Sequence, residues 1–559
     1  MRRYPFLSAV IAGAALAMPL AAGGALAEGA FDNGLVLDPD SGTRISVLLD
    51  GAPLTLMRYQ AVYAGQPVAM AVEQPARQMG PGGSPTAAKT QVLADPLAYQ
   101  SLVVFVPETA TERSAIILNV SNGGWFASEL RPGIEDGGSY VSTSATDKAG
   151  AALKAGYVYV DVGTRGRGIV AADGTAPGKA PAAVVDAKAA IRWLRLNDAA
   201  LPGSAERIVI TGTSGGGGLS AVVGASGDSA DFLPELSEIG AAGVAADGTS
   251  SMSDAVFAVI AYCPITDLGH ADLAYEWLFR SARGAATVAG GQWSDRADAA
   301  SAELAAGYAD YLDGLALKLS DGSALTAATM AGAIDAEVRA EVKRHLATGG
   351  TVPALGEPFT LQIRDATVDV PNTWLSVDGG KVTGIDHDAF VAFVATATAL
   401  KPVPAFDRTA NTGNLSMGGE NSLFGAATQD YANFTPYGWN ANEVPGDGSG
   451  VDDTGMDWVT WIVGPGASQA RQLKLINPLA YLGTDAKAAP YWRIRHGMID
   501  RDTAFAVPVA LSRAVAGDPD VAEVDFAMPW MVGHSGDYDV QDAYDWLSGV
   551  LAKAGDPPG

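Results

Sequence analysis

One serine stands among five glycines directly after an apolar, β-branched run, in residues 208–220 (IVITGTSGGGGLS). The central five residues have the spacing Gly-x-Ser-x-Gly, with Ser214 in the middle. A sharp strand-to-helix turn at this spacing strains the serine backbone and raises its hydroxyl above the sheet. Such a turn needs glycine, because a Cβ at Gly212 or Gly216 would collide with neighbouring backbone. The alternative is a flexible polar turn, but the preceding strand and the following helical stretch favour a nucleophilic serine.

Strand-like and helical stretches alternate on both sides of this turn. Apolar runs at 114–120, 157–162, 207–212 and 256–262 are accompanied by helical patterns such as residues 181–198. This alternation predicts a parallel sheet with helices on both faces. Four earlier runs (RISVLL, LTLMRYQAVY, PVAMAV and LVVFVP) predict an antiparallel leading section. Strand patterns resume at 491–500 and 521–530, and the chain closes on an amphipathic helix.

A long segment of helical patterns and Gly/Asn/Asp-rich loops interrupts the strands. We therefore expect one sheet domain, residues 28–265 and 477–559, that carries a large, mainly helical and loop-rich lid insertion, residues 266–476. Residues 1–27 combine two arginines, an apolar stretch and the small-x-small site ALA, which are the parts of a signal peptide. We expect cleavage after Ala27 and a periplasmic or secreted protein with no membrane segment after cleavage.

Charge and cysteine content restrict the partners. A formal net charge of −26 disfavours nucleic acid and anionic membrane surfaces. The single cysteine, Cys263, rules out an intrachain disulfide and a thiol-ligated zinc site, and we interpret it as a structural residue. The acid-rich stretch 440–457 lacks the spacing of a calcium-binding EF-hand loop. We predict no required metal, no cofactor and a monomer.

A nucleophilic serine needs a histidine base and a carboxylate that orients the base. Of the five histidines, His534 lies in a loop after the last strand and before the last helix, whereas His496 lies inside a strand and is interpreted as structural. Asp500 ends the strand-like run 491–500; its alternative role is a helix N-cap or a turn residue. The chain order Ser214, Asp500, His534 is that of α/β-hydrolases.

The oxyanion hole is expected to combine the backbone N–H of Gly215 with an N–H from the loop SNGGWF, which follows the strand-like run 114–120. Gly123 and Gly124 let the backbone of this loop approach a substrate closely. The alternative is an ordinary turn.

Several stretches together resemble the bacterial tannases (tannin acyl hydrolases). They are GTSGGGGLS, AYCPITDLGHADLAYEW, GTRGRG at 163–168, and YWRIRHGMIDRDT with DFAMPWMVGHSGDYD. The resemblance extends from about Arg58 to the C-terminus. It implies an α/β-hydrolase fold with a large lid, hydrolysis of galloyl esters to gallate and an alcohol, and Ser214, Asp500 and His534 as the triad.

The resemblance also implies residues that bind the galloyl ring. Asp502 matches the second acid of the family's IDRDT motif, and the lid residues are placed at Lys401 and Glu420. Carboxylates can accept hydrogen bonds from ring hydroxyls and an ammonium can donate one back, and a site built this way rejects analogues that lack the hydroxyls. The alternatives are a capping role for Asp502 and solvated surface charges for the lid pair.

Two other enzyme functions stay open from the sequence. One is a serine esterase for other aromatic esters, such as feruloyl or chlorogenate esters, because fold and triad do not set the acyl group. The other is a peptidase similar to the prolyl oligopeptidases, although no propeller repeat precedes the sheet domain. A binding module without catalysis is least favoured, because binding alone does not need a serine, an acid and a histidine together.

Overall fold

The computed structural model describes residues 29–75, 91–283, 294–363, 366–409, 419–442 and 450–555. The signal peptide predicted at 1–27 lies outside these residues. In the described ranges, no helix combines the length and the apolar character needed to cross a membrane.

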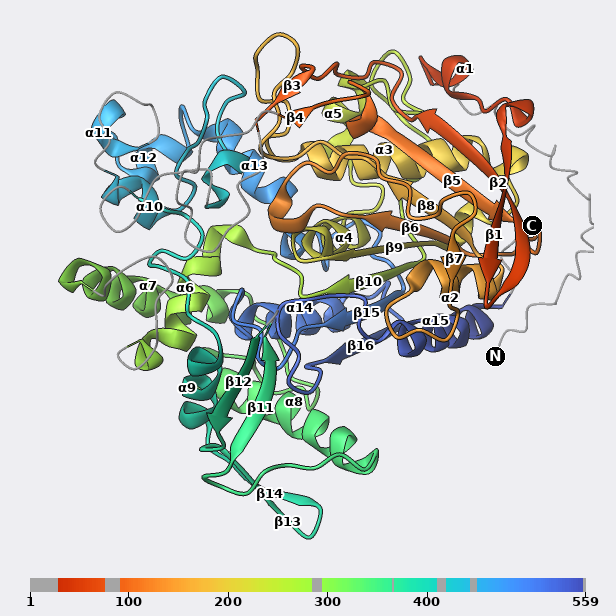
Figure 1. Ribbon diagram of the computed structural model, residues 1–559. Helices are drawn as coiled ribbons and strands as arrows, with labels where there is room; N and C mark the ends of the chain where they lie inside the picture. Colours follow the sequence, from red (N-terminus) through yellow and green to blue (C-terminus); the bar gives the residue numbers. More distant parts are fainter. Residues whose placement is uncertain are drawn as a thin grey trace, which may run out of the picture.

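A ten-stranded sheet forms the centre of the fold (Figure 1). Its strands from β16 to β8 are parallel, and β5, β2 and β1 extend it as antiparallel neighbours. In spatial order the sheet consists of β16 (Glu523–Ala527), β15 (Tyr491–Arg495), β10 (Ala258–Tyr262), β9 (Ile208–Thr213), β6 (Ile116–Val120), β8 (Val158–Val162), β5 (Ser101–Pro107), β2 (Ala52–Val62), β1 (Thr43–Leu49) and β7 (Ser139–Tyr140).

Helices cover both faces of this sheet, as the alternation of strands and helices predicts. On β5, Leu102 and Val104 belong to the hydrophobic core shared with α3 (Ala182–Leu196) and α4 (Gly215–Ala225). The alternate residues Val103 and Phe105 belong to the core shared with α2 (Lys148–Ala155) and α15 (Val540–Ala554). Because both faces are buried, strands such as β5 and β10 are apolar almost throughout instead of alternating with polar residues. The chain therefore has the α/β-hydrolase fold.

A buried cluster of charges fixes α3 to the segment before β10. Lys188 Nζ lies 2.7 Å from Asp254 Oδ1, and the Arg192 guanidinium lies 2.8 Å from Asp254 Oδ2. All three side chains are buried, so each charge depends on the others for compensation.

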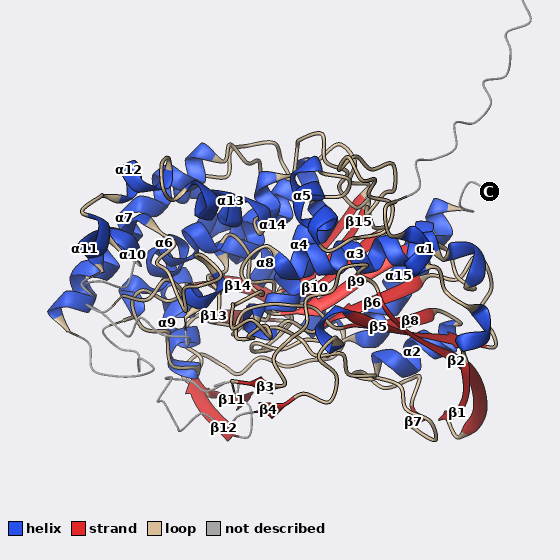
Figure 2. Cartoon of the chain, turned by 90° about the horizontal axis from the view of Figure 1, so that it is seen from above, coloured by secondary structure: helices blue, strands red, loops and turns tan. Residues whose placement is uncertain are grey.

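A large insertion leaves the sheet after β10 and returns to the neighbouring strand β15. It lies at the left and the lower side of Figure 1, opposite β1 and β2, and Figure 2 shows most of its helices grouped at one end of the molecule. Its apolar residues continue the core on the α3 and α4 face. Its helices are α6 (Leu268–Phe279), α7 (Asp295–Gly314), α8 (Ala327–Ala347), α9 (His387–Ala397), α10 (Pro436–Ala441), α11 (Val451–Thr454), α12 (Trp458–Ile462) and α13 (Ala467–Leu475).

Two hairpins lie inside the insertion where the sequence predicts helices and loops. They pair β11 (Pro358–Ile363) with β12 (Ala366–Pro371), and β13 (Leu375–Asp378) with β14 (Lys381–Ile385). The remaining helices and strands are α1 (Asp32–Leu35), β3 (Glu73–Gln74), β4 (Gln91–Val92), α5 (Leu233–Glu238) and α14 (Ala506–Gly517), and short 3-10 turns occur between elements.

The strand predicted for PVAMAV (67–72) is wrong. This segment forms only an isolated bridge between Met70 and Ala171. Its amides bond to different partners, with Met70 N donating to Pro96 O and Ala71 N to Val170 O. Pro67 also has no amide hydrogen, which removes one bond that a ladder would need.

Candidate active site

Ser214 occupies the tight turn between β9 and α4. Its φ of 63° and ψ of −121° are a strained combination for a residue with a side chain. A Cβ on Gly212 would lie 2.4 Å from Gly216 O, and one on Gly216 would lie 3.0 Å from Val120 O. The glycine spacing is therefore required by close backbone packing, as the sequence predicts.

Two hydrogen-bond contacts connect the three predicted triad residues: Ser214 with His534, and His534 with Asp500. The Ser214 Oγ is 2.8 Å from His534 Nε2, and His534 Nδ1 is 2.8 Å from Asp500 Oδ2. Asp500 follows β15 and His534 follows β16, so the two neighbouring parallel strands deliver both groups to the edge of the sheet where β9 ends. The other oxygen of Asp500 accepts a hydrogen bond from Asp502 N at 2.8 Å.

The electrostatics of this series favour an ionised acid and a basic imidazole. Burial acts to raise the pKa of Asp500, but the adjacent His534 and His496 outweigh it and hold that pKa below its ordinary value. Burial acts to lower the pKa of His534, but the Asp500 carboxylate reverses the shift and holds it well above the ordinary value. An imidazole of raised basicity is suited to take a proton from a serine hydroxyl.

The predicted oxyanion loop packs directly against the start of α4. A Cβ on Gly215 would lie 2.2 Å from Trp125 N, 2.3 Å from Asn122 O and 3.0 Å from Gly124 N. Gly124 has a φ of 59°, a conformation that glycine adopts without strain. Gly123, the residue before it, begins a short 3-10 turn that ends at Trp125. The structure thus brings this loop to the amide of Gly215.

Asp502, Lys401 and Glu420 come from separate parts of the chain and interact electrostatically in the structure. Asp502 Oδ2 lies 3.6 Å from His534 Nε2. Burial lowers the pKa of Lys401, and the carboxylates of Asp502 and Glu420 oppose that fall. Burial acts to raise the pKa of Asp502, but Lys401 and His534 reverse the shift and lower it. Glu420 is 6% exposed and Lys401 is half-buried, so neither lid residue is the fully solvated surface charge of the alternative interpretation.

Other lid residues hold Lys401 in place. Its amide donates to the Tyr275 hydroxyl at 3.0 Å, and its carbonyl accepts from Arg283 at 2.8 Å. Its ammonium lies 4.0 Å from the centre of the Phe406 ring, a cation–π contact.

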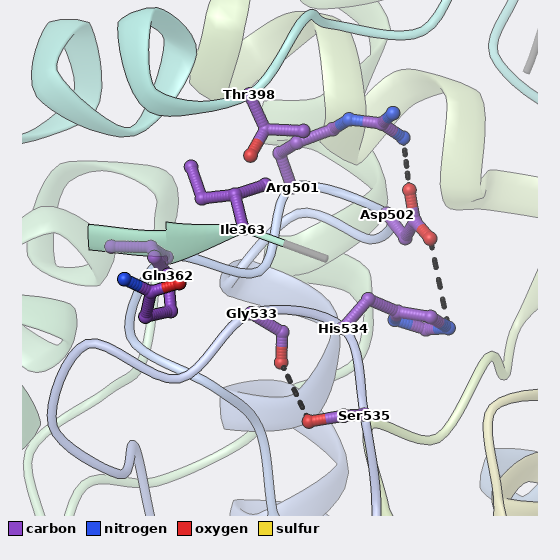
Figure 3. A pocket seen from close by; sticks show the side chains of 9 residues that line it. Gln362, Ile363, Thr398, Arg501, Asp502, Gly533, His534 and Ser535 are labelled. Atoms are coloured by element: carbon purple, nitrogen blue, oxygen red, sulfur yellow. Dashed lines mark hydrogen bonds and ion pairs between the residues drawn. The ribbon is translucent and has the colours of Figure 1, made fainter. Parts of the chain in front are cut away.

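A pocket of about 330 Å³ opens beside His534 and Asp502 (Figure 3). Figure 3 shows the dashed contacts from Arg501 to Asp502 and from Asp502 to His534. The lining combines residues after β15 and β16 with residues of the insertion, so both parts of the chain build it. The lining residues are Gln362, Ile363, Thr398, Ile499, Arg501, Asp502, Gly533, His534 and Ser535.

Several site residues were not predicted from the sequence. Gln362 and Ile363 reach the pocket from the end of β11, and the alternation PFTLQI was the available signal for that strand. Arg167, from the stretch GTRGRG, contacts both Gly124 and Glu420, and in the sequence only the family resemblance points to this stretch.

The remaining polar groups near the triad are Cys263 and His496. Cys263 Sγ lies 4.0 Å from His534 Nε2 and is buried, so it packs under the triad. His496 is fully buried with Nδ1 3.7 Å from Asp500 Oδ2. In the described ranges, the one group of His, Cys, Asp and Glu side chains close enough to share a metal ion is Cys263, Asp500 and His534.

Comparison with known proteins places this geometry among ester hydrolases. The BD-FAE family model, which describes an α/β-hydrolase family, matches residues 102–311. The chain is similar to tannase from Lactobacillus plantarum, with 30% sequence identity over 93% of this chain and 99% of the other, and a TM-score of 0.70. It is equally similar to a tannin acyl hydrolase in complex with ethyl gallate, with 30% identity, the same coverage and a TM-score of 0.69.

A second species gives the same result. Fusobacterium nucleatum tannase shares 26% identity over 92% of this chain and 99% of its own, with a TM-score of 0.69. No curated protein sequence matches the chain.

Proposed function

Because this chain belongs to the bacterial tannase family and is an ester hydrolase, we propose that it hydrolyses galloyl esters to gallate and an alcohol. The observation that carries the proposal is Asp502, which lies 3.6 Å from the triad histidine, together with Lys401, whose charge interacts with the carboxylates of Asp502 and Glu420. Two carboxylates and an ammonium match the adjacent hydroxyls of a galloyl ring, as acceptors and donor. The related tannin acyl hydrolase whose complex contains ethyl gallate supports the same acyl group.

In the proposed reaction, Ser214 Oγ attacks the ester carbonyl while His534 Nε2 takes the serine proton. Asp500 holds the imidazole in position and stabilises its charged form. The amides of Gly215 and of the Gly123–Gly124 turn donate to the oxygen that becomes negative in the tetrahedral intermediate. His534 then protonates the leaving alcohol, and the galloyl group stays bound to Ser214 Oγ as an ester, the acyl-enzyme. His534 takes a proton from a water that attacks this ester, and then returns the proton to Ser214 Oγ as the bond to the serine breaks and gallate is released.

The positions of the ring and the ester follow from the same geometry. Asp502 contacts His534 and Arg501, so a ring hydroxyl bound to Asp502 sets the distance between the ring and Ser214. Binding energy from the hydroxyls thereby orients the carbonyl towards the serine, which raises the rate as well as the affinity.

The experiment that tests the proposal compares three esters: methyl gallate, methyl ferulate and p-nitrophenyl acetate. Fast release of gallate with slow hydrolysis of ferulate supports it, and Ser214→Ala abolishes turnover of all three. Ser226→Ala, at the far end of the same helix, is the matched control and keeps turnover. Hydrolysis of methyl ferulate or p-nitrophenyl acetate without methyl gallate refutes the galloyl specificity and leaves an esterase for other acyl groups.

We also propose that the protein is exported by the segment 1–27. The test is the N-terminal sequence of the protein recovered from the periplasm and the medium. A mature chain that begins at Glu28 supports export with cleavage after Ala27, and an intact N-terminus in the cytoplasm refutes it.

A further inference from the structure

Arg167 connects the predicted oxyanion loop of the sheet domain with the lid segment that carries Glu420. Its Nε donates to Gly124 O at 2.6 Å. One terminal nitrogen donates to Gly419 O, and the other lies 3.5 Å from Glu420 Oε1. The three nitrogens of one guanidinium therefore contact the two sides of the candidate active site.

The backbone around Arg167 is fixed to the same loop. Arg167 N donates to Trp125 O at 3.1 Å, and Arg167 O accepts from Ala127 N at 3.1 Å. The guanidinium carbon lies 3.9 Å from the centre of the Phe126 ring. The side chain is 3% exposed, so its charge is removed from water. Burial accordingly lowers the pKa of Arg167, and Glu420 opposes that shift.

We propose that Arg167 is a positioning residue that makes oxyanion stabilisation and ring recognition depend on one side chain. Gly124 has no side chain to restrict its rotation. The bond from Arg167 to its carbonyl holds the peptide plane between Gly124 and Trp125, and this restrains the Gly124 Cα to which the Gly124 amide is attached. The same guanidinium holds Gly419 and Glu420, and so sets where the carboxylate meets the ring. The ring-recognition half of this inference rests on the proposed galloyl specificity.

Two substitutions separate the two effects. In Arg167→Lys the charge stays, but a single nitrogen cannot contact Gly124, Gly419 and Glu420 together. We expect kcat for p-nitrophenyl acetate, whose acyl group has no ring, to fall at least about tenfold, because the oxyanion donor is misplaced. For methyl gallate, Arg167→Lys lowers kcat/KM by about ten times more than it lowers kcat for p-nitrophenyl acetate. Glu420→Gln lowers kcat/KM for methyl gallate by a larger factor than kcat for p-nitrophenyl acetate.

Arg165→Lys is the matched control for the loss of a buried arginine. Arg165 lies in the same GTRGRG loop and is also buried, but its guanidinium bonds to Asp186 on α3, with Nε at 3.0 Å from one oxygen and a terminal nitrogen at 2.8 Å from the other. We expect Arg165→Lys to lower the thermal midpoint without changing kcat for p-nitrophenyl acetate.

The fraction of folded, reactive enzyme is counted in each preparation by titrating Ser214 with a phosphonate ester, and kcat is expressed per titrated site. If Arg167→Lys does not fold, Arg167→Gln replaces it under the same measurement. The inference is overturned if kcat for p-nitrophenyl acetate stays within twofold of wild type, or if Arg165→Lys loses as much. If wild type hydrolyses methyl gallate no better than p-nitrophenyl acetate, the proposed function fails, and the inferred role of Arg167 in ring recognition fails with it. The value of kcat for p-nitrophenyl acetate still decides whether Arg167 positions the oxyanion loop.

Discussion

Replacing Gly215 by alanine tests the oxyanion hole directly. The added Cβ would lie 2.2 Å from Trp125 N and 2.3 Å from Asn122 O, which are both backbone atoms of the oxyanion loop. A tolerable contact is above 3 Å, so the loop must withdraw by about 1 Å. A displacement of this size takes the Gly124 amide away from its place beside Gly215. We expect kcat to fall by ~10²-fold, or about 2.7 kcal/mol of transition-state stabilisation.

Gly224→Ala is the matched control, since Gly224 lies near the other end of α4. Its Cβ would lie 2.2 Å from Val259 Cγ2, an equally close contact but with an apolar side chain away from the triad. Initial rates with p-nitrophenyl acetate, divided by the number of Ser214 sites that react with a phosphonate ester, give kcat for folded enzyme. We expect Gly224→Ala to lower the thermal midpoint and leave this kcat unchanged. Equal losses of kcat in the two variants, or no loss in Gly215→Ala, contradict the assignment of the oxyanion hole.

Three further predictions follow from the charges. Because the proposed base is the free imidazole of His534 and its pKa is raised, kcat/KM should increase with pH through a pKa above 6.5 and be lost below it. Asp500→Asn removes the charge that raises this pKa, so the rise of kcat/KM should move to lower pH. A pH–rate profile whose rise does not move argues against the role of Asp500. Lys401→Met removes a charged donor whose hydrogen bond contributes about 1.5–3 kcal/mol. The value of kcat/KM for methyl gallate should therefore fall ~10–150-fold, whereas kcat/KM for p-nitrophenyl acetate should not change. Equal losses on both esters contradict ring recognition by Lys401. Asp254→Ala leaves its two basic partners on α3 buried without compensation and should lower the free energy of unfolding by about 3–5 kcal/mol in urea titrations, whereas a loss below 1 kcal/mol refutes the dependence of these charges on Asp254.

The sheet and the order of the triad could be predicted because they depend on local patterns. Fully apolar runs identify strands that are buried on both faces, and the glycines around Ser214 identify a turn that excludes Cβ atoms. The ends of neighbouring parallel strands meet at one edge, so Asp500 and His534 were expected near Ser214, and the structure places them 2.8 Å apart in series. Their catalytic roles stay a prediction.

The lid could not be predicted to the same depth. Its hairpins β11–β12 and β13–β14 are short strands within helical surroundings, and only a weak alternation marks them. The contacts of Arg167 are also not local: Gly124 lies 43 residues away and Gly419 lies 252 residues away along the chain. No spacing rule connects such positions, because the fold of the insertion alone decides which residues meet.

The place of the insertion between the neighbouring strands β10 and β15 also determines the timing of biosynthesis. Roughly 230 residues must be translated after β10 before β15 can pair with it, which takes about 10–45 s at ~5–20 residues per second. During that interval β10 is an open edge of the nascent sheet, and an open edge invites pairing with another chain. The turn that holds Ser214 is translated early, whereas Asp500 and His534 emerge last. A ribosome-bound chain therefore contains Ser214 long before the two predicted partners of this serine are translated.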